Sequence, residues 1–270
     1  ILVSYDGKLQ PTFAEVKIKH LTGFIFQGIT KFVEDSVRGA LLGCSRSGVR
    51  WFGADGEVHM SLDDGFTERI YDACIDRSGI TWLAGLNQLW KYDGTHYESC
   101  DTISPLLHNR INAIEIGKEA RLIMASSENG LIIKDGEEVF AIGEKNGLKS
   151  DMCLTLLLLD NEIWVGTNYG LGKITVEHWN PLIYKIKNYD AAIGFPVSKV
   201  TNIKEEDGEM YVTYADKLVR FFPDNLTQNT HIPKLKILDI LVSGKPMNER
   251  TNIRLKYDQN DLVIRLEALT

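Results

Sequence analysis

One strand-like motif recurs along the chain, and its regular spacing constrains the fold more than any other feature of the sequence. Each copy carries a small residue in its fourth place, and the first three intervals between these residues are 41 positions long (43 to 84, 84 to 125 and 125 to 166). The five residues are Gly43, Ala84, Ala125, Gly166 and Thr213. The last interval is 47 positions long, so we expect an insertion there, in the stretch Val176–Tyr189.

Other short apolar segments flank every copy of the motif. The copies themselves are Ala40–Cys44, Thr81–Gly85, Leu122–Ser126, Ile163–Thr167 and Met210–Tyr214. The segments before them are Lys31–Gly39, Tyr71–Gly79, Ala113–Ala120, Thr155–Asn161 and Thr201–Gly208. The segments after them are Ser47–Trp51, Asn87–Lys91, Gly130–Lys134, Gly170–Ile174 and Lys217–Phe221. Dipeptides such as Asp93-Gly94 supply the positive φ angles of tight hairpins, and a fourth strand is expected after them.

Four strands per repeat predict an all-β chain, a β-propeller of four-stranded blades. Pairs of helices can share this period, but their 3.6-residue periodicity is missing here. The segment Leu2–Gln10 aligns with Leu89–Tyr97 through a shared Tyr-Asp-Gly, so residues 1–27 are expected to form a partial blade. We therefore expect about five and a half blades within residues 1–222, with one or more blades upstream.

The repeat pattern ends after Phe222. Residues 223–232 are polar and contain a proline at the start, with another just beyond at Pro233, which is typical of a linker. Residues 233–270 contain two stretches of alternating strand pattern, Lys234–Met247 and Ile253–Leu269. We expect this segment to be the N-terminal part of a β-sandwich.

Charge and composition exclude several classes of function. The formal net charge is −7 without a basic cluster, so we expect no nucleic-acid partner. No apolar run approaches the roughly 18–20 residues of a membrane-spanning helix, so contact with a membrane is expected only through segments outside this chain. The four cysteines lie outside Cys-x-x-Cys pairs, and Cys44 and Cys74 fall in apolar strands, which favours buried free thiols and no metal site.

Three features that suggest chemistry are better explained by structure. Trp82 and Trp164 sit at equivalent repeat positions, so packing between blades is favoured over sugar stacking. Ser61–Thr67 resembles one Asp box of sialidase propellers, which is a turn motif. The acidic runs Asp63–Asp64 and Glu205–Asp207 lack the alternating ligands of a calcium loop. With no catalytic motif and no phosphate loop, we predict no catalytic residues, no cofactor and no enzyme.

Two stretches carry a resemblance to known families. Ile163–Leu171 (IWVGTNYGL) resembles the core of the two-component regulator propeller repeat, and Gly147–Cys153 (GLKSDMC) is similar to the lead-in of that repeat, with Cys153 in place of Val. Pro233–Leu269 resembles the start of the Y_Y_Y domain, the sandwich that follows such propellers. Only the repeat at Ile163–Leu171 has the full motif.

The resemblance implies the sensor region of a Bacteroidetes-type hybrid sensor histidine kinase, with a seven-bladed ring in the periplasm. On that basis we expect an extracytoplasmic ligand-sensing region of a two-component system, which binds an oligosaccharide or another polar small ligand. A homodimer formed through the full-length receptor is implied as well. The alternatives are a protein-interaction propeller scaffold and, as a minor one, a carbohydrate-active enzyme.

Candidate ligand-binding residues follow from propeller geometry. The loop between the two middle strands of a blade and the loop that leads into its first strand lie on the same face, so their polar side chains can converge on a ligand. The residues predicted on this ground are Arg69, Asn87, His108, Arg110, Glu128, Lys149, Asn168 and Tyr169.

Overall fold

The computed structural model describes part of the 270-residue chain. The described residues are 3–4, 12–13, 28–53, 58–226, 234–247, 255–257 and 261–269. They divide into two compact units, Ile1–Pro223 and Asp224–Thr270. Of the expected partial blade, only two dipeptides are described, β1 (Val3–Ser4) and β2 (Thr12–Phe13), which pair antiparallel. The rest of that prediction lies outside the described residues, as does 227–233 in the region of the expected linker.

Five antiparallel sheets follow one another along the first unit, and we number them as blades 1 to 5. Blade 1 contains β3 (Ile29–Asp35), β4 (Ala40–Ser45), β5 (Gly48–Gly53) and β6 (Val58–Met60). Blade 2 contains β7 (Ile70–Ile75), β8 (Thr81–Gly85), β9 (Leu89–Tyr92) and β10 (Tyr97–Ser99). Blade 3 contains β11 (Ile111–Ile116), β12 (Leu122–Ser126), β13 (Leu131–Asp135) and β14 (Glu138–Ile142). Blade 4 contains β15 (Cys153–Leu159), β16 (Glu162–Thr167), β17 (Gly170–His178) and β18 (Ile183–Tyr189). Blade 5 contains β19 (Val200–Glu206), β20 (Glu209–Tyr214) and β21 (Leu218–Phe221).

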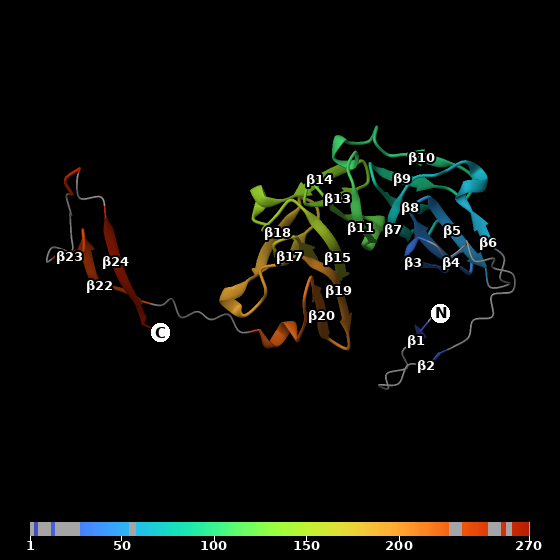
Figure 1. Ribbon diagram of the computed structural model, residues 1–270. Coiled ribbons are helices and arrows are strands. Elements are labelled where there is room, and N and C mark those ends of the chain that lie inside the picture. Colours follow the sequence, from blue (N-terminus) through green and yellow to red (C-terminus); the bar gives the residue numbers. More distant parts are fainter. Residues whose placement is uncertain are drawn as a thin grey trace. The chain divides into compact units, whose positions relative to one another are not determined.

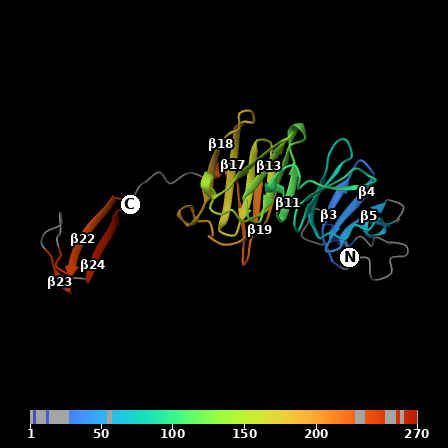
Figure 2. The same cartoon turned by 90° about the horizontal axis from the view of Figure 1, so that it is seen from above.

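Consecutive blades pack through their first strands. β3 contacts β7, β7 contacts β11, β11 contacts β15 and β15 contacts β19. Figure 1 shows these strands as neighbours along the first unit, and Figure 2 shows the sheets of the middle blades standing side by side. Within each blade the strands pair in chain order through hairpins. This arrangement is a β-propeller, as the repeat predicts.

Apolar residues fill the spaces between neighbouring blades. Leu42 and Trp51 of blade 1 pack with Leu83 of blade 2. Ile123 of blade 3 packs with Val165 of blade 4. The motif strands are therefore buried on both faces, which explains why they are apolar runs rather than alternating strands.

Both tryptophan predictions are confirmed as packing. Trp164 is fully buried, and its ring centroid lies 5.2 Å from that of Tyr189 and 5.9 Å from that of Phe221 in blade 5. Trp82 packs partly buried against the core between blades 2 and 3, and its Nε1 donates to Asp76 Oδ2 at 3.3 Å. Trp164 is therefore not free to stack on a sugar, and Trp82 contributes to packing between blades.

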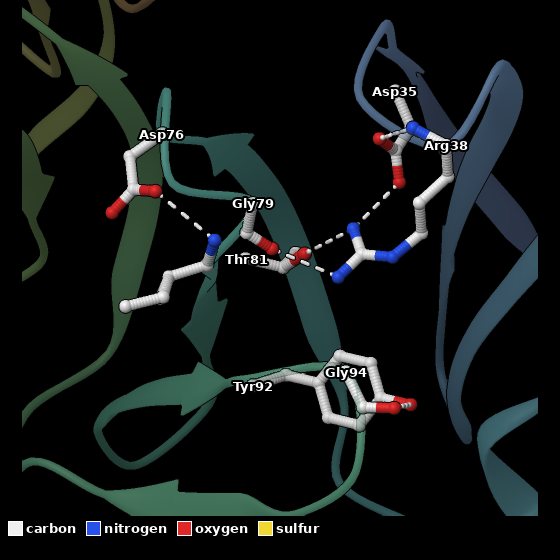
Figure 3. A network of polar contacts seen from close by, with 8 residues as sticks. Asp35, Arg38, Asp76, Gly79, Thr81, Tyr92 and Gly94 are labelled. Atoms are coloured by element: carbon white, nitrogen blue, oxygen red, sulfur yellow. Dashed lines mark hydrogen bonds and ion pairs between the residues drawn. The ribbon is translucent and has the colours of Figure 1, made fainter.

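An arginine links the first hairpins of blades 1 and 2. Arg38 donates from Nη1 to Asp35 Oδ2 at 2.8 Å and to Thr81 Oγ1 at 3.3 Å, and from Nη2 to the Gly79 carbonyl at 2.8 Å. Figure 3 shows the side chain reaching from one hairpin to the other, above the ring of Tyr92. Asp35 is fully buried, so Arg38 neutralises a carboxylate that water cannot reach.

Two expectations about the blades have different outcomes. The insertion lies where it was expected, because β17 and β18 form an outer hairpin of 9- and 7-residue strands, against 5 and 5 for the equivalent β13 and β14. The fifth repeat, in contrast, was expected to have four strands and has three in the described part of the chain. The chain turns away after β21 because Pro223 begins a 3-10 turn, Pro223–Asn225.

The described 3-10 turns connect the strands. Besides Pro223–Asn225, they are Ser61–Asp64, Pro105–Leu107, Lys118–Ala120, Glu144–Asn146 and Ala191–Ile193. The sialidase-like segment is structural, as predicted. Ser61 is buried, and its Oγ accepts from the Val49 N–H at 2.8 Å and donates to the Phe66 carbonyl at 3.2 Å.

Four buried cysteines remain free thiols. Cys44 and Cys74 lie in the strands predicted for them, and Cys100 and Cys153 are buried as well. Burial raises the pKa of each of these thiols, since the thiolate would lose its hydration. We therefore expect all four to be unreactive.

The second unit contains a small antiparallel sheet. Its strands are β22 (Lys234–Val242), β23 (Lys245–Pro246) and β24 (Leu262–Leu269), in the order β23-β22-β24. A bulge separates Ile237 from Asp239, and Arg265 pairs with Asp239 at 3.3 Å. The three strands lie within the two stretches predicted to alternate, whereas 255–257 is not part of a strand and 253–254 and 258–260 lie outside the described residues. That it forms part of a sandwich remains a prediction.

Candidate functional site

The two kinds of loop named by the sequence lie side by side at one end of the blades, which we call the loop face. In blade 2 the Leu86 N–H donates to the Arg69 carbonyl at 3.0 Å, and in blade 3 the Ser127 N–H donates to the Arg110 carbonyl at 2.9 Å. Blade 5 repeats the bond between Ala215 and Lys199. Blade 4 has the equivalent bond from the Asn168 N–H to the Met152 carbonyl at 3.3 Å, so in blades 2 to 5 the loop after the second strand adjoins the start of the first strand.

A β-bulge lies at the start of each first strand, next to this face, and inserts one extra residue there. The bulges lie between Ile29 and Lys31, Ile70 and Asp72, Ile111 and Ala113, Cys153 and Thr155, and Val200 and Asn202. The inserted residue therefore differs from blade to blade. It is Thr30, Tyr71, Asn112, Leu154 or Thr201. Bulges of this kind commonly re-aim side chains next to functional sites.

An open groove of about 720 Å³ lies on the loop face where blades 3, 4 and 5 meet. The loops between successive blades and the loop between β16 and β17 form its walls. Its lining residues are Glu144, Lys149, Tyr169, Asp190, Ala191, Ala192 and Val197. Of the eight residues predicted to bind a ligand, Lys149 and Tyr169 are among them.

The groove combines charged and apolar surfaces. Lys149 Nζ lies 3.8 Å from Asp190 Oδ2, and both side chains keep a substantial exposed fraction, 51% and 39%. Tyr169 is 57% exposed and Val197 is 56% exposed. A flat ring beside a lysine and a carboxylate can stack against an apolar ring face of a ligand while the charged groups bond its hydroxyls.

Hydrogen bonds between backbone N–H groups and side-chain carboxylates fix the loop that carries Lys149. The Glu144 N–H donates to Asp151 Oδ1 at 2.7 Å, and the Asp151 N–H donates to Glu144 Oε1 at 3.3 Å. A Cβ at Gly143 would lie 2.0 Å from that same Oδ1, so only glycine permits this approach. The loop is therefore held in place before any ligand arrives, which lowers the entropic cost of binding.

A second group of candidates meets between blades 2 and 3. The guanidinium carbons of Arg69 and Arg110 lie 4.8 Å and 4.2 Å from the centroid of the Tyr71 ring. Tyr71 is the bulge residue of blade 2 and is half-buried. Two predicted arginines thus share one aromatic ring that the sequence did not single out.

The neighbouring candidates of blade 3 are tied to one another. With its amide oriented to satisfy its neighbours, Asn109 donates to Glu128 Oε2 at 2.9 Å and accepts from Asn129 Nδ2 at 2.5 Å. It also donates to the carbonyl of His108 at 3.2 Å. Glu128 therefore serves to order these loops, and His108 contributes its backbone while its side chain is exposed.

The remaining two candidates lie apart from both groups. Asn87 is exposed on the loop after β8. Asn168 precedes Tyr169, and its Oδ1 is buried without a hydrogen-bond partner in the described part of the chain. The residues that sequence reasoning missed are Tyr71, Glu144, Asp190 and Val197. The bulge at Tyr71 depends on how β7 pairs with β8, and no local sequence pattern predicts it.

A charged line crosses the first strands of blades 1 to 3. Lys31 Nζ lies 2.6 Å from Asp72 Oδ2, which also accepts from the Ile114 N–H at 3.0 Å. Glu115 Oε2 accepts from the Leu158 N–H at 3.0 Å. Burial raises the pKa of Asp72, with Lys31 acting in the opposite direction, and burial raises the pKa of Glu115 to about 7. These carboxylates join one blade to the next.

Among the described residues, no group of three or more His, Cys, Asp or Glu side chains is arranged to hold a metal ion. The same residues include no helix with the length and apolar character needed to cross a membrane.

Known proteins are similar to this chain in structure but not in sequence, and the structural similarity supports the β-propeller fold. No family model matches the chain, and no curated protein matches its sequence. The extracellular domain of a candidate hybrid two-component system from B. thetaiotaomicron is similar over 89% of this chain and 35% of its own length, with a TM-score of 0.66 and 16% identity. Such a domain from another candidate hybrid system of B. thetaiotaomicron is similar over 88% of this chain and 41% of its own, with a TM-score of 0.58 and 13% identity.

An enzyme shares the fold as well. A streptogramin B lyase is similar over 77% of this chain and 72% of its own length, with a TM-score of 0.53 and 11% identity. At these identities the likeness shows the β-propeller fold alone, so the expected resemblance to sensor propellers is confirmed for the fold. The chain spans about a third of the length of the extracellular sensor domain to which its TM-score is 0.66.

Proposed function

We propose that this chain is part of the extracytoplasmic, periplasmic region of a two-component sensor, and that it binds a carbohydrate or another polar small ligand without turning it over. The observation that carries the proposal is the groove at the junction of blades 3, 4 and 5, lined by Lys149, Tyr169 and Asp190. The similarity in fold to two extracellular sensor domains supports the sensing role.

The groove suits a sugar because sugars present apolar ring faces together with hydroxyl groups. Tyr169 offers an exposed ring, and Val197 adds an apolar wall. Asp190 accepts hydrogen bonds and Lys149 donates them, so a ligand hydroxyl could replace the long 3.8 Å contact between the two. Contacts from three successive blades would make ligand affinity sensitive to how those blades pack.

A sensor must convert binding into a change of state. A ligand does so only when its affinity differs between two conformations. Here those conformations would differ in the packing of neighbouring blades, and a homodimer of the longer receptor would carry the difference to its signalling parts. Both steps are part of the proposal, and the second involves segments beyond this chain.

Calorimetric titration with a panel of neutral oligosaccharides tests the groove. We expect one glycan class to bind, and the substitution Tyr169→Ala to weaken its binding about tenfold, because a stacked aromatic contact contributes roughly 1–1.5 kcal/mol. Lys149→Met should weaken binding as well.

The matched control is Tyr257→Ala, which removes another exposed tyrosine, 98% exposed, from the second unit. It should leave the dissociation constant unchanged. If no glycan binds, or if Tyr169→Ala binds as tightly as the unchanged chain, sugar binding in the groove is wrong. Release of a modified product during the titration would instead favour an enzyme.

A further inference from the structure

Arg69 and Arg110 form a concentrated positive site around Tyr71. They occupy equivalent positions in blades 2 and 3, each directly before the first strand of its blade. Both guanidinium groups lie over the Tyr71 ring, at 4.8 Å and 4.2 Å, well inside the roughly 6 Å range of a cation–π contact. The bulge that inserts Tyr71 into β7 places the ring where both can reach it.

No carboxylate of the described residues neutralises these two arginines. Neither side chain takes part in an ion pair or a side-chain hydrogen bond with a residue that the structure describes. Asp72 pairs with Lys31, and Glu128 accepts from Asn109. Glu68 directly precedes Arg69, and among the described residues its carboxylate makes no ion pair with either arginine. Both guanidinium groups therefore keep donors to which no described residue offers an acceptor.

A bound anion would stabilise this arrangement of two positive charges. Two like charges that share one ring repel each other, and the ring offsets only part of that repulsion. Guanidinium groups bind carboxylate, sulfate and phosphate through paired hydrogen bonds with a planar fork. The chain as a whole is acidic, with a net charge of −7, whereas this site holds two positive charges that no described carboxylate pairs with.

We propose that Arg69, Tyr71 and Arg110 form a binding site for an oxyanion, either a free inorganic anion or the acidic group of a larger ligand. The guanidinium groups bind the anion, and Tyr71 holds both arginines in position. The site shares no residue with the groove lined by Lys149 and Tyr169. It therefore goes beyond the proposed sensing function and does not depend on it.

Titration of the intact chain at low ionic strength with three probes tests the site. The probes are inorganic sulfate, an oligogalacturonate, and a neutral oligosaccharide of the same length. We expect at least one anionic probe to bind about tenfold or more tightly than the neutral one, and the double substitution Arg69→Gln and Arg110→Gln to abolish that preference. The double substitution to Lys should retain part of it, because a lysine keeps the charge but loses the paired donors.

The matched control is Arg77→Gln, which removes one positive charge from the exposed turn between β7 and β8, opposite the loop face. It should leave anion binding unchanged, and the unfolding midpoint of each variant should confirm that it folds.

The outcomes distinguish two sources of the anion. Sulfate binding that depends on the two arginines identifies a free oxyanion as sufficient; binding of the oligogalacturonate alone identifies an acidic sugar. The proposal is overturned if neither anion binds, or if the Gln variant binds anions as the unchanged chain does. Tyr169→Ala should have no effect on sulfate, so failure here is distinct from failure of the groove.

Discussion

Gly166 shows at the scale of one residue why the fourth place of the repeated motif is small. A Cβ on Gly166 would lie 2.5 Å from Cγ1 of Val200 and 2.6 Å from Cγ2 of Thr155. Val200 begins the first strand of blade 5, so the missing side chain is what lets blade 5 pack closely on blade 4. The equivalent positions in blades 2 and 3 hold alanines, Ala84 and Ala125, and both are fully buried.

Gly166→Ala should therefore destabilise the chain by overpacking, at a cost of about 1–3 kcal/mol. The measurement is urea unfolding followed by tryptophan fluorescence, since Trp164 lies two residues away. The control is Gly117→Ala, where the nearest atom to the new Cβ is the end of the Leu158 side chain at 3.3 Å, which can move. Equal stability of the two variants would show that blade 5 can shift to accommodate the methyl group.

At the scale of elements, individual polar side chains connect a hairpin of one blade to a hairpin of the next. Arg38 bonds its own turn through Asp35 and the next blade through Gly79 and Thr81 (Figure 3). Its side chain is 29% exposed, whereas Asp35 is fully buried. Loss of the arginine would leave that carboxylate with one bond from the Arg38 backbone N–H, at 2.9 Å, and no counter-charge.

Arg38→Met should lower the free energy of unfolding by about 2–4 kcal/mol, because a buried carboxylate loses its counter-charge. The free energy of unfolding of Arg38→Lys should lie between those of the unchanged chain and Arg38→Met. An ammonium group keeps the charge but cannot donate to three acceptors with the geometry of a guanidinium. Adding Asp35→Asn to Arg38→Met should recover part of the loss. A double variant less stable than Arg38→Met alone would contradict this explanation.

Across the whole molecule, the line of charges over the first strands makes stability depend on pH. Lys31, Asp72 and Glu115 come from blades 1, 2 and 3, and Glu115 bonds to the Leu158 N–H of blade 4. Burial raises the pKa of Glu115 from 4.5 to about 7 in the folded chain. Between these values the folded state binds more protons than the unfolded one, so stability falls as the pH rises through this window.

Glu115→Gln should remove this part of the pH dependence while keeping an oxygen that accepts from Leu158. Relative to the unchanged chain, the variant should gain about 1–3 kcal/mol at pH 8 and little at pH 4, since each unit of pKa shift corresponds to about 1.4 kcal/mol. Urea unfolding of both proteins at several pH values measures this difference in the free energy of unfolding. Glu138→Gln, at an exposed position on β14, should leave the profile unchanged. Parallel profiles for the Glu115 variant and the unchanged chain would contradict the assignment.

The candidate site was predictable only in part. Lys149 and Tyr169 were named because propeller topology puts their loops on one face, and the structure brings them into one groove. Asp190 and Val197 lie in the loop that leads into β19, which the same topology puts on this face, but nothing in the local sequence marks which residues of this loop line the groove. Tyr71 was not predicted as a site residue because it lies in strand β7, and sequence reasoning took strand residues to be part of the packed core.

The sequence by itself determined the propeller, because hydrophobic spacing and turn residues act locally and repeat with each blade. The burial of Cys44 and Cys74, two packed tryptophans and the site of the insertion follow from the same periodicity. Only the tertiary structure decided which loop residues meet, since convergence depends on bulges, on hairpin lengths and on how tightly one blade packs on the next. It also decided that the fifth repeat has three strands in the described part of the chain, where a proline turn ends a pattern that the repeat alone would continue.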